Sequence, residues 1–206
     1  MKKKFYRSQA EMIIKKLQLR KMEGYYCENK EEALAKLLEL IGDTPKTIAN
    51  GGSVTLNQIG AKKAVQKAGH ELVLKEKYEN QKEWIARQAT ADVFMTSTNA
   101  ITLDGELVNI DGVGSRVSMM IFGPDEVIVV AGMNKVVTDV EAGIKRIHNF
   151  AAPLNALRIN ADTPCKQMEK CENCLKNTIC CNIVVTRATR FANRIKVILV
   201  GEELGF

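Results

Sequence analysis

The sequence has few aromatic residues, few histidines and no long apolar run, and each shortage argues against a class of function. Phe, Trp and Tyr make up 5% of the 206 residues, and no basic strand interleaved with aromatics is present. Proteins that stack nucleic-acid bases use such strands, so we expect no nucleic-acid partner. The two histidines, His70 and His148, lack the partner spacing of a catalytic triad or a zinc protease, and neither is assigned a catalytic role.

The sequence also has no segment with the pattern of a membrane span or a secretion signal. The longest uncharged apolar stretches, 118–124 and 127–133, are much shorter than the roughly 20 residues that span a bilayer. Charged residues from Arg7 to Lys16 interrupt the basic N-terminus before a signal-peptide core can form. We therefore expect a cytoplasmic protein without a membrane partner.

The overall composition is that of a water-soluble globule. Hydrophobic residues make up 46% and charged residues 26% of the chain, and the length suits one domain over residues 1–206. The net charge of +6 is scattered among glutamates on predicted helix faces. This favours a solvated surface, although a phosphate-bearing small molecule would use the same charge.

The order of elements predicts an α/β fold with a mainly parallel sheet flanked by helices. Two N-terminal helices are expected within 8–45, one over 8–22 and one that Asn29 caps and Gly42 ends. Strands over 47–49, 70–74, 92–98 and 126–132 alternate with helices over 54–68, 78–90, 115–120 and 137–150, the last ending near Pro153. Asp104-Gly105 predicts a β-hairpin inserted between 101 and 108, and 182–186 and 194–204 resume strand character.

Five of the six cysteines fall within the stretch from Cys165 to Cys181, in a cysteine-rich loop over 162–182. Two thiolates separated by two residues can bind one metal ion, and the flanking cysteines can complete a four-sulfur shell. Free buried cysteines are the alternative, and disulfides are the weaker explanation in a cytosolic chain. The expected ligands are Cys165, Cys171, Cys174 and Cys180, with Cys181 as the alternative to Cys180. Zinc and a [4Fe-4S] iron–sulfur cluster both suit four sulfurs.

Glycines and polar side chains at strand ends predict a binding cleft for a small anionic ligand. Residues 50–53 form a glycine-rich turn before a helix that Ser53 caps, and residues 109–116 combine glycines, Ser115 as a cap and Arg116. Arg116 could hold an anion by two parallel hydrogen bonds, or it could form a surface ion pair with Asp111. An ordinary capped turn explains the first pattern equally well.

The stretch 96–159, from "TSTNAITLDGELVNIDG" through "GMNK" to "AAPLNA", resembles the conserved core of the LUD (lactate utilisation) family, and "ANGGSVT" at 49–55 fits its N-terminal half. The resemblance implies the fold of the sugar-phosphate isomerases and CoA transferases, with a ligand cleft at the strand ends. It implies a cleft lined by Asn50, Gly51, Gly52, Ser53, Thr98, Asn99, Asp104, Asn109, Asp111, Gly112, Arg116, Asn134 and Lys135. Ser115 departs from the asparagine that is frequent in the family before the arginine.

The resemblance also implies a link to oxidation of L-lactate to pyruvate, together with other iron–sulfur proteins of lactate utilisation. The leading hypothesis is an accessory or electron-transfer component with a cysteine-bound iron–sulfur cluster. The alternative is a binding protein or enzyme for an anionic or phosphorylated small molecule, with zinc pinning the C-terminal loop. A scaffold with an unused pocket is a third interpretation. Whether the chain catalyses a reaction and whether it forms a homo-oligomer stay open.

Overall fold

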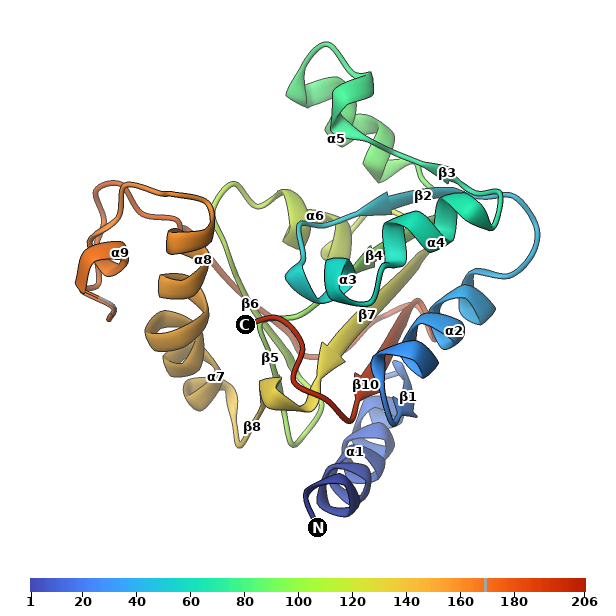
Figure 1. Cartoon of the computed structure of the whole chain (residues 1–206), viewed down its shortest axis with the longest axis horizontal. Helices are drawn as coiled ribbons and strands as arrows, with labels where there is room; N and C mark the ends of the chain where they lie inside the picture. Colours follow the sequence, from blue (N-terminus) through green and yellow to red (C-terminus); the bar gives the residue numbers. More distant parts are fainter. Residues whose placement is uncertain (169) are drawn as a thin grey trace.

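The computed structural model describes residues 1–168 and 170–206, and a six-stranded sheet lies at its centre (Figure 1). The strands, in their spatial order, are β1 (Glu23–Cys27), β10 (Ile195–Val200), β7 (Glu126–Gly132), β4 (Val93–Thr96), β2 (Thr47–Asn50) and β3 (Glu71–Leu72). Every neighbouring pair is parallel. The predicted α/β class with a mainly parallel sheet is therefore confirmed.

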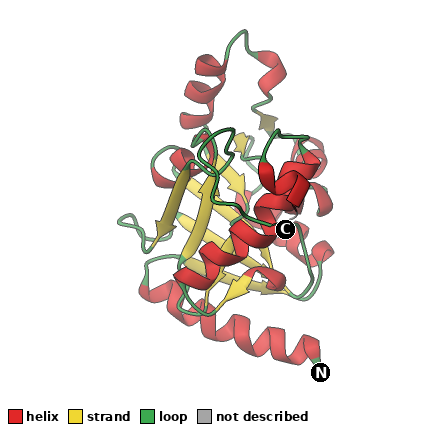
Figure 2. Cartoon of the chain, turned by 90° about the vertical axis from the view of Figure 1, so that its left-hand side faces the viewer, coloured by secondary structure: helices red, strands yellow, loops and turns green. Residues whose placement is uncertain are grey.

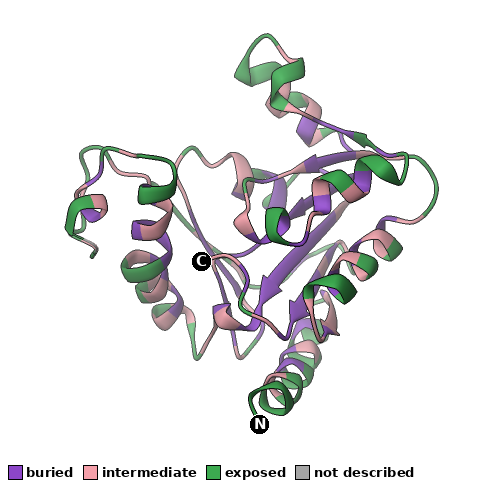
Figure 3. Cartoon of the chain, viewed as in Figure 1, coloured by how far each residue is buried: buried purple, intermediate pink, exposed green. Residues whose placement is uncertain are grey.

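Helices cover both faces of this sheet, because its strands are apolar on both sides. Along β7, Val127 and Val129 face one apolar cluster, whereas Ile128 and Val130 face the other. The first face packs against α1 (Lys2–Leu19), α5 (Gln81–Ala89) and α6 (Ser115–Ile121), and a short 3₁₀ turn, η1 (Lys75–Lys77), precedes α5. The second face packs against α2 (Lys30–Ile41), α3 (Val54–Gln58) and α4 (Ala61–Lys67). The central strands are accordingly buried in Figure 3.

A second, four-stranded sheet stands beside the first. Its order is β8 (Val136–Val137), β5 (Ala100–Thr102), β6 (Leu107–Asp111) and β9 (Asn182–Thr186). The predicted hairpin is confirmed as the antiparallel pair of β5 and β6, with Gly105 in the left-handed conformation at a φ of +84°. The short 3₁₀ turn η2 (Met133–Lys135) connects β7 of the first sheet to β8 of the second, so this turn joins the two sheets directly.

One long helical segment covers the second sheet. It consists of α7 (Val140–Arg146), a π-helical turn η3 (Ile147–Ala151) and α8 (Ala152–Arg158), and it runs in front of the strands in Figure 2. Ile147 and Ala151 pack against Val108 and Ile110 of β6. The chain then continues through α9 (Pro164–Met168) and the cysteine loop to β9.

Two of the predicted helix caps are confirmed and one is wrong. The side chain of Asn29 accepts a hydrogen bond from the Glu32 amide, and that of Ser53 accepts one from the Leu56 amide. Ser115, by contrast, is the first residue of α6 and makes no capping hydrogen bond. The carboxylate of Asp111 performs this role, because it accepts from the amides of Gly114 and Val117.

Several predicted boundaries are corrected. The first helix extends over Lys2–Leu19 rather than 8–22, since the exposed residues before Ser8 continue the helix without needing an apolar partner. The expected helix over 54–68 breaks at Gly60, whose φ of +72° is left-handed. The strand expected over 70–74 pairs only at Glu71–Leu72, because it lies at the edge of the sheet. The helix expected to begin at 78 begins at Gln81, after the capping Asn80.

The helix expected to end near Pro153 continues to Arg158. Pro153 lies in the first turn of α8, where a residue without an amide hydrogen is tolerated, and the preceding π-helical turn carries the chain into that position. Among the described residues, no helix is both long and apolar enough to cross a membrane.

Candidate functional site

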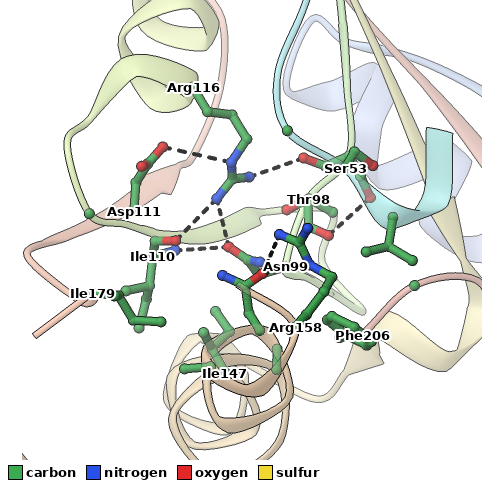
Figure 4. Close-up of a pocket in the computed structure, with 18 of the residues that line it drawn as sticks. Ser53, Thr98, Asn99, Ile110, Asp111, Arg116, Ile147, Arg158, Ile179 and Phe206 are labelled. Carbon is green, nitrogen blue, oxygen red and sulfur yellow. Dashed lines mark hydrogen bonds and ion pairs between the residues drawn. The ribbon is translucent and has the colours of Figure 1, made fainter. Parts of the chain in front are cut away.

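A pocket opens at the carboxyl ends of the parallel strands. The turns that follow β2 and β4 supply Ser53 and Thr98, the η2 turn after β7 supplies Lys135, and the C-terminal segment after β10 supplies Gly205 and Phe206. Residues of β6, α6, η3 and α8 close the opposite side, so that both sheets contribute (Figure 4). The cavity measures about 400 Å³, which suits a small molecule. Ligands of open parallel sheets usually bind at this edge.

Eight of the predicted ligand-binding residues line this pocket, namely Gly52, Ser53, Thr98, Asn99, Asp111, Gly112, Arg116 and Lys135. They come from four separate stretches of the sequence. The structure therefore brings together the glycine-rich turn, the polar end of β4, the turn before α6 and the lysine after β7.

The five other predicted residues lie outside the lining. Gly51 packs under the pocket against Arg116, and Asn50 donates only to the carbonyl oxygen of Gly51. Asn109 is fully buried in β6. Asn134 binds the C-terminal segment, accepting from the Leu204 amide at 3.1 Å. Asp104 lies at the hairpin turn, and its carboxylate is 3.1 Å from the amine of Lys16.

The guanidinium of Arg116 is held by the protein itself. One terminal nitrogen donates to the carbonyl oxygen of Ser97 and to Asn109 Oδ1, and the other donates to Asn99 Oδ1 and the carbonyl oxygen of Ile110, at 2.5 to 3.1 Å. Its Nε lies 3.7 Å from a carboxylate oxygen of Asp111. Among the described residues, only Nε of this guanidinium lacks a hydrogen-bond acceptor, so the donors of Arg116 serve mainly to hold the pocket wall together (Figure 4).

Asn99 links this wall to the second sheet. Its side-chain oxygen also accepts from the Ile110 amide at 3.0 Å, and its carbonyl oxygen accepts from Arg146 at 2.9 Å. The backbone amide of Asn99 donates to Asn109 Oδ1 at 3.2 Å. The end of β4, β6 and α7 are thereby fixed relative to one another by buried polar contacts, which positions the pocket-facing residues.

Lys135 is the most unusual charged group of the site. The residue is 4% exposed, and its amine donates to Thr55 Oγ1 and to Ser97 Oγ, each at 2.9 Å. Burial, and then the nearby positive charges of Arg146 and Arg116, lower the pKa of Lys135 to about 7. No carboxylate is among the groups that shift this pKa. Among the described residues, the amine of Lys135 therefore lines the pocket with two hydroxyl partners and no carboxylate.

Several lining residues escaped the sequence prediction. Arg158 and Asn155 reach the pocket from α8, where Asn155 Oδ1 accepts from two nitrogens of Arg158. Thr55 and Ser97 complete the surroundings of Lys135. Ser97 carried a detectable signal, because it lies in the polar run that ends β4. The contributions of α8 and of Phe206 depend on contacts between distant segments, which no local pattern reveals.

The predicted metal ligands are close together in the sequence but are not assembled into a metal site. Among the described residues, no three Cys, His, Asp or Glu side chains are grouped so that they could hold a metal ion. Cys165 is buried, Cys171, Cys174 and Cys180 are half-buried, and Cys181 is exposed. Burial and the four other loop cysteines raise the pKa of Cys180 to about 11. The raised pKa favours the neutral thiol of Cys180.

Comparisons with known proteins agree with this architecture. Residues 10–200 match the family model described as the LUD domain. A solved structure of a DUF162 family protein from Deinococcus radiodurans is similar over 96% of this chain and 98% of that chain, with 14% identity and a TM-score of 0.54. At that identity the similarity shows the fold alone. No curated protein matches the sequence.

Proposed function

Because this chain belongs to the LUD domain family, we propose that it binds a small anionic metabolite in the strand-end pocket and serves lactate utilisation through that ligand. The observation that carries the proposal is Lys135, a buried amine that lines the pocket without a carboxylate partner. A short hydroxy acid, oxo acid or phosphate ester would supply the missing negative charge.

The surroundings of the pocket support an anion rather than a cation or a neutral apolar ligand. Arg116, Lys135 and Arg158 all line it, while Asp111 is already engaged with Arg116 and with two backbone amides. The remaining charge is positive. Apolar side chains such as Ile147 and Phe206 form another part of the lining, which strengthens electrostatic contacts by excluding water.

A thermal-shift panel of lactate, pyruvate, inorganic phosphate and a sugar phosphate tests this proposal. A ligand at about 100 times its Kd raises the free energy of unfolding by about 2.7 kcal/mol, which corresponds to several degrees in Tm. We expect such a shift for at least one anion in the wild type and in Lys63→Met, which removes an exposed lysine of α4. The shift should vanish in Lys135→Met. An equal shift in Lys135→Met, or none in the wild type, would contradict the proposal.

A second proposal concerns the cysteine loop and is independent of the pocket. Five thiols within one short stretch, with four of them near enough to Cys180 to raise its pKa, favour a metal-binding role after the loop rearranges. We propose that Cys165, Cys171, Cys174 and Cys180 bind zinc or a [4Fe-4S] cluster. In the cluster-bound form the chain would carry electrons to other iron–sulfur proteins of lactate utilisation.

Elemental analysis and a visible spectrum after anaerobic purification test the second proposal. Iron with sulfide and a broad visible absorption would support electron transfer. A colourless protein with stoichiometric zinc would leave only a structural role, and a protein without either metal would contradict both forms. Cys171→Ser is the informative variant, whereas Cys27→Ser, a buried cysteine of β1, is the matched control outside the loop.

A further inference from the structure

The hydrogen bonds around Lys135 define which protons its amine can use. Thr55 Oγ1 donates its own proton to the carbonyl oxygen of Leu204 at 3.3 Å. Ser97 Oγ has two acceptors within reach, the carbonyl oxygen of Thr98 at 3.2 Å and Thr55 Oγ1 at 3.4 Å. Both hydroxyls can therefore accept from the amine of Lys135, which is 2.9 Å from each.

A neutral amine has two N–H donors and one lone pair. In this arrangement the two hydroxyls take both donors, and the lone pair occupies the one remaining tetrahedral position of the nitrogen. Within the part of the chain that the structure describes, Lys135 makes no third hydrogen bond. Because Lys135, Thr55 and Ser97 all line the pocket, a ligand bound there meets an amine whose lone pair has no protein partner.

The charges that face Lys135 favour this neutral form. Arg146 of α7 and Arg116 of α6 are the charged groups that act on it, and both are positive. The neighbouring turns contribute only the hydroxyls of Thr55 and Ser97 and the backbone of the C-terminal segment. The amine is thus held in a state that most lysines reach only in alkaline solution.

We propose that Lys135 is a nucleophilic amine that forms a Schiff base with a small carbonyl compound carrying a carboxylate or phosphate group. The inference rests on the proposed anion-binding function and adds the reactive group of the ligand. The lone pair of Nζ attacks the carbonyl carbon, and the π bond of the carbonyl breaks to give a carbinolamine. The two amine protons then leave with the carbonyl oxygen as water, and a C=N bond forms, so that amine and carbonyl give imine and water.

The hydroxyls of Thr55 and Ser97 are placed to transfer protons in this step. Each accepts a hydrogen bond from the amine in the resting protein, so each can take a proton from nitrogen while it passes its own hydroxyl proton to the departing oxygen. Arg158, which lines the pocket and is exposed, attracts the anionic group of the ligand. Arg146 and Arg116 disfavour a positive charge on Lys135 before the carbonyl arrives.

Trapping with sodium cyanoborohydride at pH 7 tests the proposal directly. The full-length protein is incubated with pyruvate, a 2-oxo acid, or with glyceraldehyde 3-phosphate, a sugar phosphate, and intact mass and peptide mapping locate any reduced adduct. With a pKa of about 7 against 10.5, Lys135 has on the order of a thousandfold more neutral amine than an ordinary lysine. We expect one adduct per chain at Lys135, and the more reactive probe identifies the ligand source.

Variants separate this outcome from unspecific modification. Lys63→Met should keep the single adduct, Lys135→Met should lose it, and Ser97→Ala should slow its formation without removing Lys135. If Lys135→Met fails to fold, peptide mapping of the wild type alone still decides the site. Adducts spread over exposed lysines, with none preferred at Lys135, would overturn the inference.

L-lactate has no carbonyl carbon that can condense with an amine in this way. Its binding therefore separates the proposed anion site from the proposed Schiff base. If calorimetry shows that lactate or phosphate binds while neither carbonyl probe is trapped, the Schiff base is refuted and the anion site stands. If no anion binds and no adduct forms, both proposals fail. Protection of Lys135 from trapping by added lactate would support both.

Discussion

Arg116 and Lys135 are both buried cations at one pocket, but their partners differ. Arg116 donates to four protein acceptors and lies beside Asp111, so its charge and its donors are largely satisfied. Within the described part of the chain, Lys135 donates only to two hydroxyls. A residue whose hydrogen bonds close within the protein stabilises the wall, whereas one with an unmatched charge is available to a ligand.

The replacement Arg116→Met tests the structural role. It leaves buried acceptors and the carboxylate of Asp111 without their partner, so we expect the free energy of unfolding to fall by about 3–5 kcal/mol. Arg158→Met is the matched control, because Arg158 lines the same pocket but is exposed, and its loss should change stability by no more than about 0.5 kcal/mol. Urea denaturation measures both. Equal stabilities of the two variants would contradict the assignment.

The sequence pattern identified these residues but could not assign their roles. The glycine-flanked turn predicts an anion contact for Arg116, and the resemblance to the LUD family places both Arg116 and Lys135 in the cleft. Whether such a cation has internal partners depends on Asn99, Asn109 and Ser97, which approach only after β4 and β6 fold. Thr55 and Arg158 were missed for the same reason.

At the scale of elements, the glycine-rich turn between β2 and α3 supports the pocket from below. A Cβ atom at Gly51 would lie 2.8 Å from Thr96 Oγ1 and 2.9 Å from Arg116 Cγ, whereas one at Gly52 would meet nothing within 4 Å. The two neighbouring glycines therefore have different functions. Gly51 allows close packing against the arginine, and Gly52 leaves room on the pocket side.

The paired substitutions Gly51→Ala and Gly52→Ala test this difference. We expect Gly51→Ala to lower the free energy of unfolding by about 1–3 kcal/mol, because the added methyl group has to displace packed atoms. Gly52→Ala should stay within about 0.5 kcal/mol of the wild type. Thermal or urea unfolding provides the comparison, and an unaffected Gly51→Ala protein would show that Arg116 adjusts freely.

The elements with strong local signals were the ones predicted well. The buried strands β4 and β7 and the caps Asn29 and Ser53 follow from short patterns of apolar and polar residues. For the four-stranded sheet the sequence predicts the hairpin and the strand over 182–186 but not their pairing, since β6 and β9 are segments about seventy residues apart. The continuation of the helix past Pro153 depends on a π-helical turn that the sequence does not mark.

At the scale of the whole molecule, the pocket exists because two sheets meet at η2. One sheet contributes its strand ends and the other contributes a wall and the helices α7 and α8, while the C-terminal segment ends between them in Figure 1. Lys135 lies at this junction, where side chains from both sheets exclude water. The lowered pKa of Lys135 is therefore a property of the assembled fold. It should make the free energy of unfolding depend on pH.

The pH dependence of unfolding tests that expectation. Between a folded pKa of about 7 and the ordinary value of 10.5, the unfolded chain holds a proton on Lys135 that the folded chain has lost. Stability of the wild type relative to Lys135→Met should therefore rise with pH across this window, by a few kcal/mol at about 1.4 kcal/mol per pKa unit. Below pH 7 the penalty for the buried charge is complete. A constant difference from pH 6 to 10 would contradict the lowered pKa.

Calorimetric titration of the wild type with a binding anion at pH 8, in two buffers of different ionisation enthalpy, measures the central claim most directly. An anion beside Lys135 favours its charged form, so binding should take up close to one proton from the buffer, and Lys135→Met should show neither the proton uptake nor the affinity. Binding without proton uptake, or with the same affinity in Lys135→Met, would show that the anion does not meet this lysine.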